Sequence, residues 1–129
     1  MKEKWLAMCQ SSTRTAKLLH ERHFFRSSMS RTYYAAYAAL VAVLSAQRGI
    51  RFDYGGNNPS HERLRRMIWG LNAKRFERHL IAKVHHTMNR LWTARIEADY
   101  GVKARIDENY SRECLINLHR ILGYSGLEL

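Results

Sequence analysis

A chain of 129 residues can bury one hydrophobic core, so we expect a single domain over residues 1–129. The chain has 22 lysines and arginines against 11 aspartates and glutamates, which gives a net charge of +11 at pH 7. This charge favours nucleic acid as the partner, and the alternative is a helical domain that is basic without binding nucleic acid. Two cysteines without a paired motif, and no secretory leader, exclude a disulfide-stabilised secreted domain and predict a cytoplasmic protein.

The first predicted helix runs over about Lys2–His23, because apolar residues recur along one face at spacings of three and four. A second runs over about Ser28–Arg48 and ends at Gly49, a residue suited to a helix C-terminus. Within it, residues 31–44 are small or apolar on every face, which predicts a helix buried all round. This stretch spans roughly 21 Å, too little for a hydrocarbon core of about 30 Å, so we expect a central bundle helix and no membrane span.

The only proline and a cluster of glycines indicate a loop over residues 49–60. Ser60 at its end is a good N-cap for a short helix over about His61–Leu71. That helix carries a dense basic run, including Arg63 and Arg66, followed by Trp69. Such a surface can hold phosphate and stack a base, and a solvated basic face is the alternative interpretation.

A long helix is predicted over about Lys74–Tyr100, and its apolar stripe faces the second helix. A last helix starts near Asp107, whose charge suits the positive N-terminal end, and runs to Leu122. Residues 123–129 are expected to form a flexible tail. The predicted core of this helical bundle comprises Tyr33, Tyr37, Leu40, Leu44, Leu80, Val84, Met88 and Leu91.

The apolar stripe of the long helix ends in a charged pair, Arg95 and Asp99, which stand four residues apart and can bond along one face. The pair either closes the core as a salt bridge or presents a guanidinium to a ligand in a cleft of low dielectric. Antiparallel packing would bring the start of the second helix, with Arg31 and its tyrosines, to this pair. We therefore expect a polar end of the bundle built from both helices.

Four features in order have the look of a known family: residues 30–37, the glycine-bearing loop, the Ser60-His61 helix start, and residues 94–101. Together they resemble the HEPN domains (higher eukaryotes and prokaryotes nucleotide-binding), over about Lys2–Leu122. The resemblance implies an up-and-down antiparallel four-helix bundle with an extra short helix, usually dimeric. It also implies a toxin–antitoxin or other defence system, often with a small nucleotidyltransferase encoded next door. A histidine is common at the start of the short helix in that family, so His61 is a candidate ligand contact.

Many members of that family are metal-independent ribonucleases, with an arginine followed four to six residues later by a histidine that handles protons. Here Asp99 and Tyr100 stand where that histidine is expected, so the catalytic candidates are Arg95, Asp99 and Tyr100. Arg112 and His119 on the last helix form a second candidate pair, although such spacings arise by chance in a chain this rich in arginine.

Two functions therefore stay open. In one, the protein is an RNA-directed toxin or ribonuclease whose site joins Arg31, Arg95 and Tyr100. In the other, it is a non-catalytic dimeric adaptor that binds a nucleotide or docks a nucleotidyltransferase antitoxin. No metal or other cofactor is expected, because no cluster of histidine, cysteine and carboxylate has ligand spacing. The candidate contacts to RNA or nucleotide are Arg31, Tyr34, His61, Arg63 and Arg66.

Overall fold

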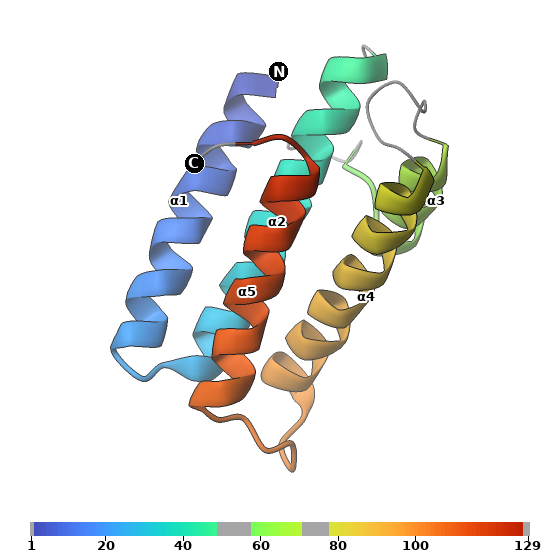
Figure 1. Ribbon diagram of the computed structural model, residues 1–129. Coiled ribbons are helices and arrows are strands. Elements are labelled where there is room, and N and C mark those ends of the chain that lie inside the picture. Colours follow the sequence, from blue (N-terminus) through green and yellow to red (C-terminus); the bar gives the residue numbers. More distant parts are fainter. Residues whose placement is uncertain (1, 49–57, 71–77, 128–129) are drawn as a thin grey trace.

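The computed structural model describes residues 2–48, 58–70 and 78–127 (Figure 1). The described ranges contain helices and no strand, which confirms the predicted all-α fold. None of their helices has the length and apolar character needed to cross a bilayer. In chain order the helices are α1 (Lys2–Glu21), α2 (Phe25–Arg48), α3 (His61–Trp69), α4 (Arg78–Tyr100) and α5 (Glu108–Tyr124).

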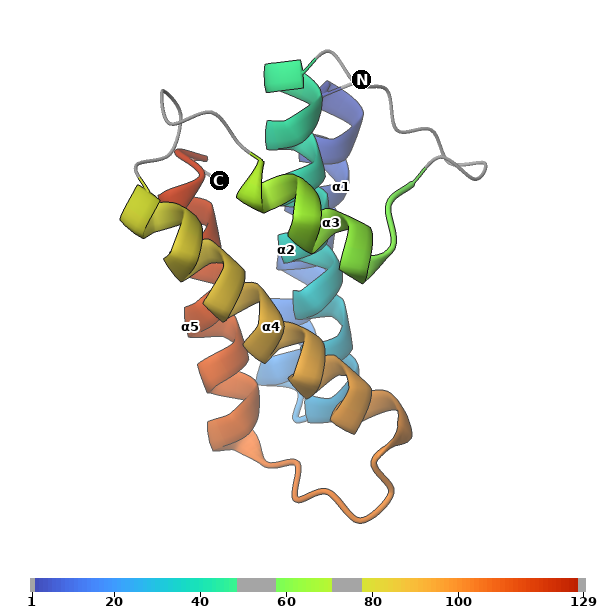
Figure 2. The ribbon, with the colours of Figure 1, turned by 90° about the vertical axis from the view of Figure 1, so that its right-hand side faces the viewer.

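The four long helices α1, α2, α4 and α5 lie side by side and alternate in direction (Figure 1). The short helix α3 crosses α2 and α4 toward the end where α2 finishes and α4 starts (Figure 2). Helix α2 is central, since it contacts each of the other described helices. Because α2 and α4 run antiparallel, the first turns of α2 lie beside the last turns of α4.

The centre of the core is α2, whose residues 38–44 are all buried. The many alanines of α2 keep its surface narrow, so neighbouring helices approach it closely. The burial on every face that was expected for residues 31–44 holds for residues 38–44 but not for the first turn of this stretch, where Arg31 and Tyr34 are exposed because their polar ends reach water. Six of the predicted core residues are buried, whereas Tyr37 and Leu80 are partly buried and pack against the rest. The hydroxyl of Tyr37 donates to the carbonyl oxygen of Pro59 at 2.6 Å, which ties α2 to the start of α3.

The corner between α1 and α2 differs from the prediction. Helix α1 ends at Glu21 because His23 adopts a left-handed backbone (φ 65°) and the amide of Phe24 donates to the carbonyl of Leu19 at 2.8 Å. The chain then re-enters a helix at Phe25, three residues before the predicted start. Ser28 is buried within α2, and its hydroxyl donates to the carbonyl of Ala16 on α1 at 2.7 Å.

Other helix ends also shift by a few residues. Helix α3 ends at Trp69 rather than Leu71, and the predicted start of the long helix at Lys74 lies outside the described residues. Helix α5 continues past Leu122 to Tyr124. Leu127, in the segment expected to be a flexible tail, packs against the core, and its amide donates to the carbonyl of Leu122 at 2.9 Å.

Candidate functional site

The start of α2 and the end of α4 share polar contacts. A terminal nitrogen of Arg95 (Nη2) donates to the hydroxyl of Tyr34 at 3.1 Å. The hydroxyl of Ser30 donates to Oδ2 of Asp99 at 3.4 Å. These contacts place the candidate residues of both helices at one end of the molecule.

Arg95 is the centre of this group, which we call the Arg95 cluster (Tyr34, Trp92, Arg95, Asp99 and Tyr100). Its guanidinium carbon lies 5.6 Å, 5.1 Å and 5.8 Å from the ring centres of Tyr34, Trp92 and Tyr100. Its Nε lies 3.0 Å from Oδ2 of Asp99, in a contact without hydrogen-bond alignment, so their attraction is mainly coulombic. The side chain of Arg95 is only 15% exposed, and this desolvation strengthens its attraction to carboxylate and rings alike.

A cavity of about 380 Å³ adjoins the Arg95 cluster, and Tyr34 and Asp99 belong to both. Arg31 lines this Arg31 cavity, and its side chain is exposed. Within the described ranges Arg31 has no hydrogen bond or ion pair from its side chain. The cavity therefore combines a free guanidinium with a carboxylate that Arg95 already neutralises.

Arg26 lines this cavity and connects α2 to the end of α4 through hydrogen bonds. Its two terminal nitrogens donate to the carbonyl oxygens of Glu97, Ala98, Gly101 and Ala104 at 3.1–3.2 Å. These carbonyls belong to the end of α4 and the turn after it, where helical partners run out and the helix dipole is negative. Arg26 thus caps α4 from the first turn of α2 and sets the axial position of one helix against the other.

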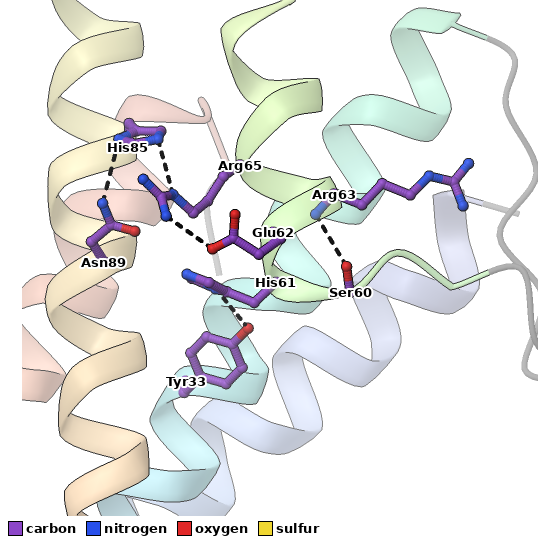
Figure 3. A network of polar contacts seen from close by, with 8 residues as sticks. All are labelled: Tyr33, Ser60, His61, Glu62, Arg63, Arg65, His85 and Asn89. Atoms are coloured by element: carbon purple, nitrogen blue, oxygen red, sulfur yellow. Dashed lines mark hydrogen bonds and ion pairs between the residues drawn. The ribbon is translucent and has the colours of Figure 1, made fainter.

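His61 lies behind the Arg95 cluster rather than in the cavity. It is 7% exposed, and its ring stacks on Trp92 with centres 4.3 Å apart and planes 9° from parallel. Its Nδ1 shares a hydrogen bond of 3.2 Å with the hydroxyl of Tyr33 (Figure 3). The residue predicted as a ligand contact is therefore buried, and it touches the cluster through Trp92.

Helix α3 is fastened to α4 by a second set of contacts (Figure 3). Arg65 pairs with Glu62 at 3.1 Å, and its Nε donates to Nε2 of His85 at 3.2 Å. Because Nε2 accepts from a guanidinium, the ring of His85 is neutral. Arg63 points away from this network and, like Arg66, is exposed.

Burial controls the protonation of both histidines in this network. Desolvation lowers the pKa of His61, and the pKa of His85 is lowered by burial and by the charge of Arg65. Burial raises the pKa of Tyr33, the partner of His61. All three side chains are therefore neutral at pH 7, so the positive charge around this network comes from the arginines.

The sequence matches the HEPN domain family over residues 2–127, which is nearly the whole chain. The chain belongs to the HEPN family. No match was found among curated proteins. In the described part of this HEPN domain, no three His, Cys, Asp or Glu side chains gather where they could hold a metal ion.

The second candidate pair of this HEPN chain, Arg112 and His119, lies on α5. Arg112 pairs with Glu108 at 3.0 Å and donates to Asn109 at 2.9 Å. His119 stands two helical turns further on, about 10 Å along the axis. Burial and the charge of Lys17 lower its pKa. The structure therefore holds the two side chains in separate surroundings.

Two residues at the candidate site, Trp92 and Arg26, are not among those expected from the sequence. Trp92 bridges His61 and Arg95, and its spacing of three residues before Arg95 is a signal that could have revealed it. Arg26 precedes the expected start of the second helix at Ser28, so the sequence pattern does not put it on the first turn of α2. Nothing in the local pattern indicates that its partners are carbonyls some 70 residues away.

Proposed function

We propose that this HEPN protein binds RNA or a nucleotide at the end of the bundle where α2 begins and α4 ends. The observation that carries the proposal is the exposed guanidinium of Arg31, which has no partner among the described residues and lines a cavity of about 380 Å³. The net charge of +11 draws a polyanion toward such a site.

Each side chain of the site has a task in this proposal. Arg31 binds phosphate with its planar fork. Tyr34 and Tyr100, which are 41% and 69% exposed, offer faces on which bases stack. Arg95 neutralises Asp99 and orients the hydroxyl of Tyr34, so the carboxylate does not repel the phosphate.

Helix α3 lies toward the opposite end of the bundle and supplies a second basic surface in this proposal. Arg63 and Arg66 are exposed and add phosphate contacts. His61 supports the stacked ring of Trp92 from inside and contributes rigidity rather than a direct ligand contact.

Binding without turnover is the form of the function that we place first. A ribonuclease would use Arg95 to hold phosphate, with Asp99 and Tyr100 as the groups that exchange protons. The ribonucleases of this family have a histidine at that position, and His61, the histidine in contact with the cluster through Trp92, is buried and neutral. An adaptor needs no proton acceptor, so this observation favours it.

The family resemblance supplies the biological setting of the proposal. We place the protein in the cytoplasm, in a toxin–antitoxin or defence-type system, as a homodimer whose partner is a small nucleotidyltransferase antitoxin. The neighbouring gene tests this directly, because it should encode that enzyme. Co-expression of the two tagged proteins should then yield a stable complex.

Fluorescence anisotropy with a labelled single-stranded RNA of about ten nucleotides tests the site itself. Arg31→Gln and Tyr34→Ala should each weaken binding about tenfold, through a lost phosphate contact and a lost stacking face. Arg14→Gln is the matched control, since Arg14 is exposed on α1. Equal affinities for Arg31→Gln and Arg14→Gln would rule out this site. Competition by unlabelled mononucleotides shows whether RNA or nucleotide is preferred.

Incubation of the same RNA with the protein and a chelator separates the two forms of the function. Intact RNA together with binding supports the adaptor. Cleavage that disappears in Arg95→Lys, which keeps the charge and loses the fork, supports the ribonuclease.

A further inference from the structure

A second site candidate lies between α4 and α5, on a part of the surface that the proposed function does not use. Three cavities of about 340, 360 and 230 Å³ adjoin there, and Arg90 and Asn117 line all three. Their walls extend on α4 from Ala82 to Ala94, roughly 18 Å at 1.5 Å per residue. We call this surface the α4–α5 groove; the two helices run alongside each other in Figure 1.

Two cations, Lys83 and Arg90, and the ring of His86 form one wall of the groove on α4. Lys83, His86 and Arg90 stand at i, i+3 and i+7, so they project from the same face of the helix. All three are exposed, and in the described ranges their side chains have no hydrogen bond or ion pair. By contrast, Arg65 and Arg95 are bound to acidic side chains nearby.

The opposite wall comes from α5. Arg120 is exposed and donates to Oδ1 of Asn117 at 3.1 Å. Asn117 is only 9% exposed yet lines every one of the cavities, so its amide forms part of the floor. Among the described residues of these walls Glu113 is the one carboxylate, so together they carry a net positive charge.

We infer that the α4–α5 groove binds the phosphate backbone of a single RNA strand. Phosphate oxygens accept hydrogen bonds from guanidinium groups, lysine ammonium groups and side-chain amides, all of which line this groove. These donors are spread along the groove, so they suit several successive phosphates rather than one. Tyr110 and Tyr124 line its two ends, where both are partly buried and pack against the core, so they shape the groove.

This inference rests on the proposed function for the class of ligand and goes beyond it for the surface. Arg90 and Arg95 are five residues apart on α4, so they point about 140° away from each other around the helix axis. A strand held in the groove therefore adds contacts that the Arg31 cavity does not make. RNA should consequently bind more tightly than a mononucleotide.

The test measures the affinity for a labelled single-stranded RNA of about ten nucleotides at several salt concentrations. Arg90→Gln combined with Arg120→Gln should weaken binding about tenfold or more and lower the slope of log affinity against log salt by about 1.4, at 0.7 per lost contact. Lys4→Gln combined with Arg14→Gln removes the same charge from exposed positions on α1 and should change affinity less than about twofold. Lys83→Gln, which removes no hydrogen bond or ion pair of the described residues, should also weaken RNA binding.

Parallel measurements on Arg95→Lys separate the two proposals. Equal RNA affinities for the groove double variant (Arg90→Gln with Arg120→Gln) and the α1 double variant (Lys4→Gln with Arg14→Gln) would overturn the inference. If Arg95→Lys binds RNA more weakly in that case, the proposed function still stands. A loss confined to the groove variants supports the groove and contradicts the site at the Arg31 cavity. A parent protein that binds no RNA at low salt overturns both. Loss of a captured acidic protein from the groove variants, with RNA affinity unchanged, assigns the groove to that protein and overturns the inference.

Discussion

The guanidinium of Arg95 is surrounded by three aromatic rings and one carboxylate, so a single side chain both closes the core and shapes the surface beside it. Its pairing with Asp99 follows from their spacing of four residues on one helix. Its contact with Tyr34 depends on which face α4 turns toward α2. The two interpretations of the pair, structural and functional, are therefore combined in one residue.

Arg95→Ala should lower the free energy of unfolding by about 1–3 kcal/mol, because it leaves a partly buried carboxylate without its partner. Arg112→Ala is the matched control. Its pair with Glu108 has the same spacing but is about half exposed on both sides, so we expect a loss below about 0.5 kcal/mol. Urea unfolding of both variants measures the difference, and equal losses would contradict the assignment.

At the scale of elements, the polar end exists because α2 and α4 run antiparallel, which brings the first turns of α2 beside the last turns of α4. Arg26 on α2 bonds four carbonyls at the end of α4, and Tyr110 on α5 donates to Glu97 at 2.5 Å. Gly101 follows α4 where a Cβ would lie 2.7 Å from the carbonyl oxygen of Glu97. These contacts determine where α4 stops and how it is oriented.

Arg26→Ala should destabilise the fold by about 2–3 kcal/mol, since charge-assisted bonds to a helix end are lost and the carbonyls stay partly buried. Arg26→Lys keeps the charge but not the fork, and should recover less than half of the loss. Arg22→Ala, which removes an exposed arginine near the end of α1, is the control with little expected effect. Thermal unfolding compares the three, and a tolerated Arg26→Ala would contradict the capping role.

His23→Gly should stabilise the protein by roughly 0.5–1 kcal/mol. His23 has φ 65° at the end of α1, a backbone region that glycine enters without the steric cost of a Cβ. The loss of its ring contact with Phe25, at 5.4 Å between centres, opposes part of this gain. An increase in the urea midpoint without a change in slope would confirm the prediction, and a decrease would show that the ring contact dominates.

At the scale of the whole molecule, stability should fall as the solution is acidified. The folded protein lowers the pKa of His61, His85 and His119, so the unfolded chain binds protons more readily than the folded one. The contribution of these three histidines to the free energy of unfolding is therefore fully present above their unfolded-state pKa of about 6.5. It decreases as the pH falls from there toward their lower pKa values in the folded protein. Thermal melts between about pH 8 and 5 measure this slope, and His61→Gln should reduce it. A slope of the opposite sign would contradict the burial of these rings.

We also expect the chain to form a two-fold dimer, as the HEPN resemblance implies. Several large apolar side chains are exposed in the described part, including Phe24, Trp69 and Val102, and an interface would cover such residues. Light scattering at micromolar concentration should report about twice 15.2 kDa. A mass that stays at the monomer value across the concentration range would contradict the dimer.

The sequence by itself determined the helical class, the central helix and most of the core. The all-round apolar character of residues 31–44 and the apolar stripe of the long helix depend only on spacings within one helix, which the helical repeat converts directly into faces. The cap at Ser60 is also local, since its side chain accepts from the amide of Arg63, three residues later.

Only the tertiary structure decided which side chains meet across helices. Each residue turns a helix by about 100° and advances it by about 1.5 Å, so a small shift between neighbouring helices changes every contact between them. The capping of α4 by Arg26, the stacking of His61 on Trp92 and the cationic wall at Arg90 all depend on that rotation and shift. No local pattern records them, because their energies arise between residues that are far apart in the chain.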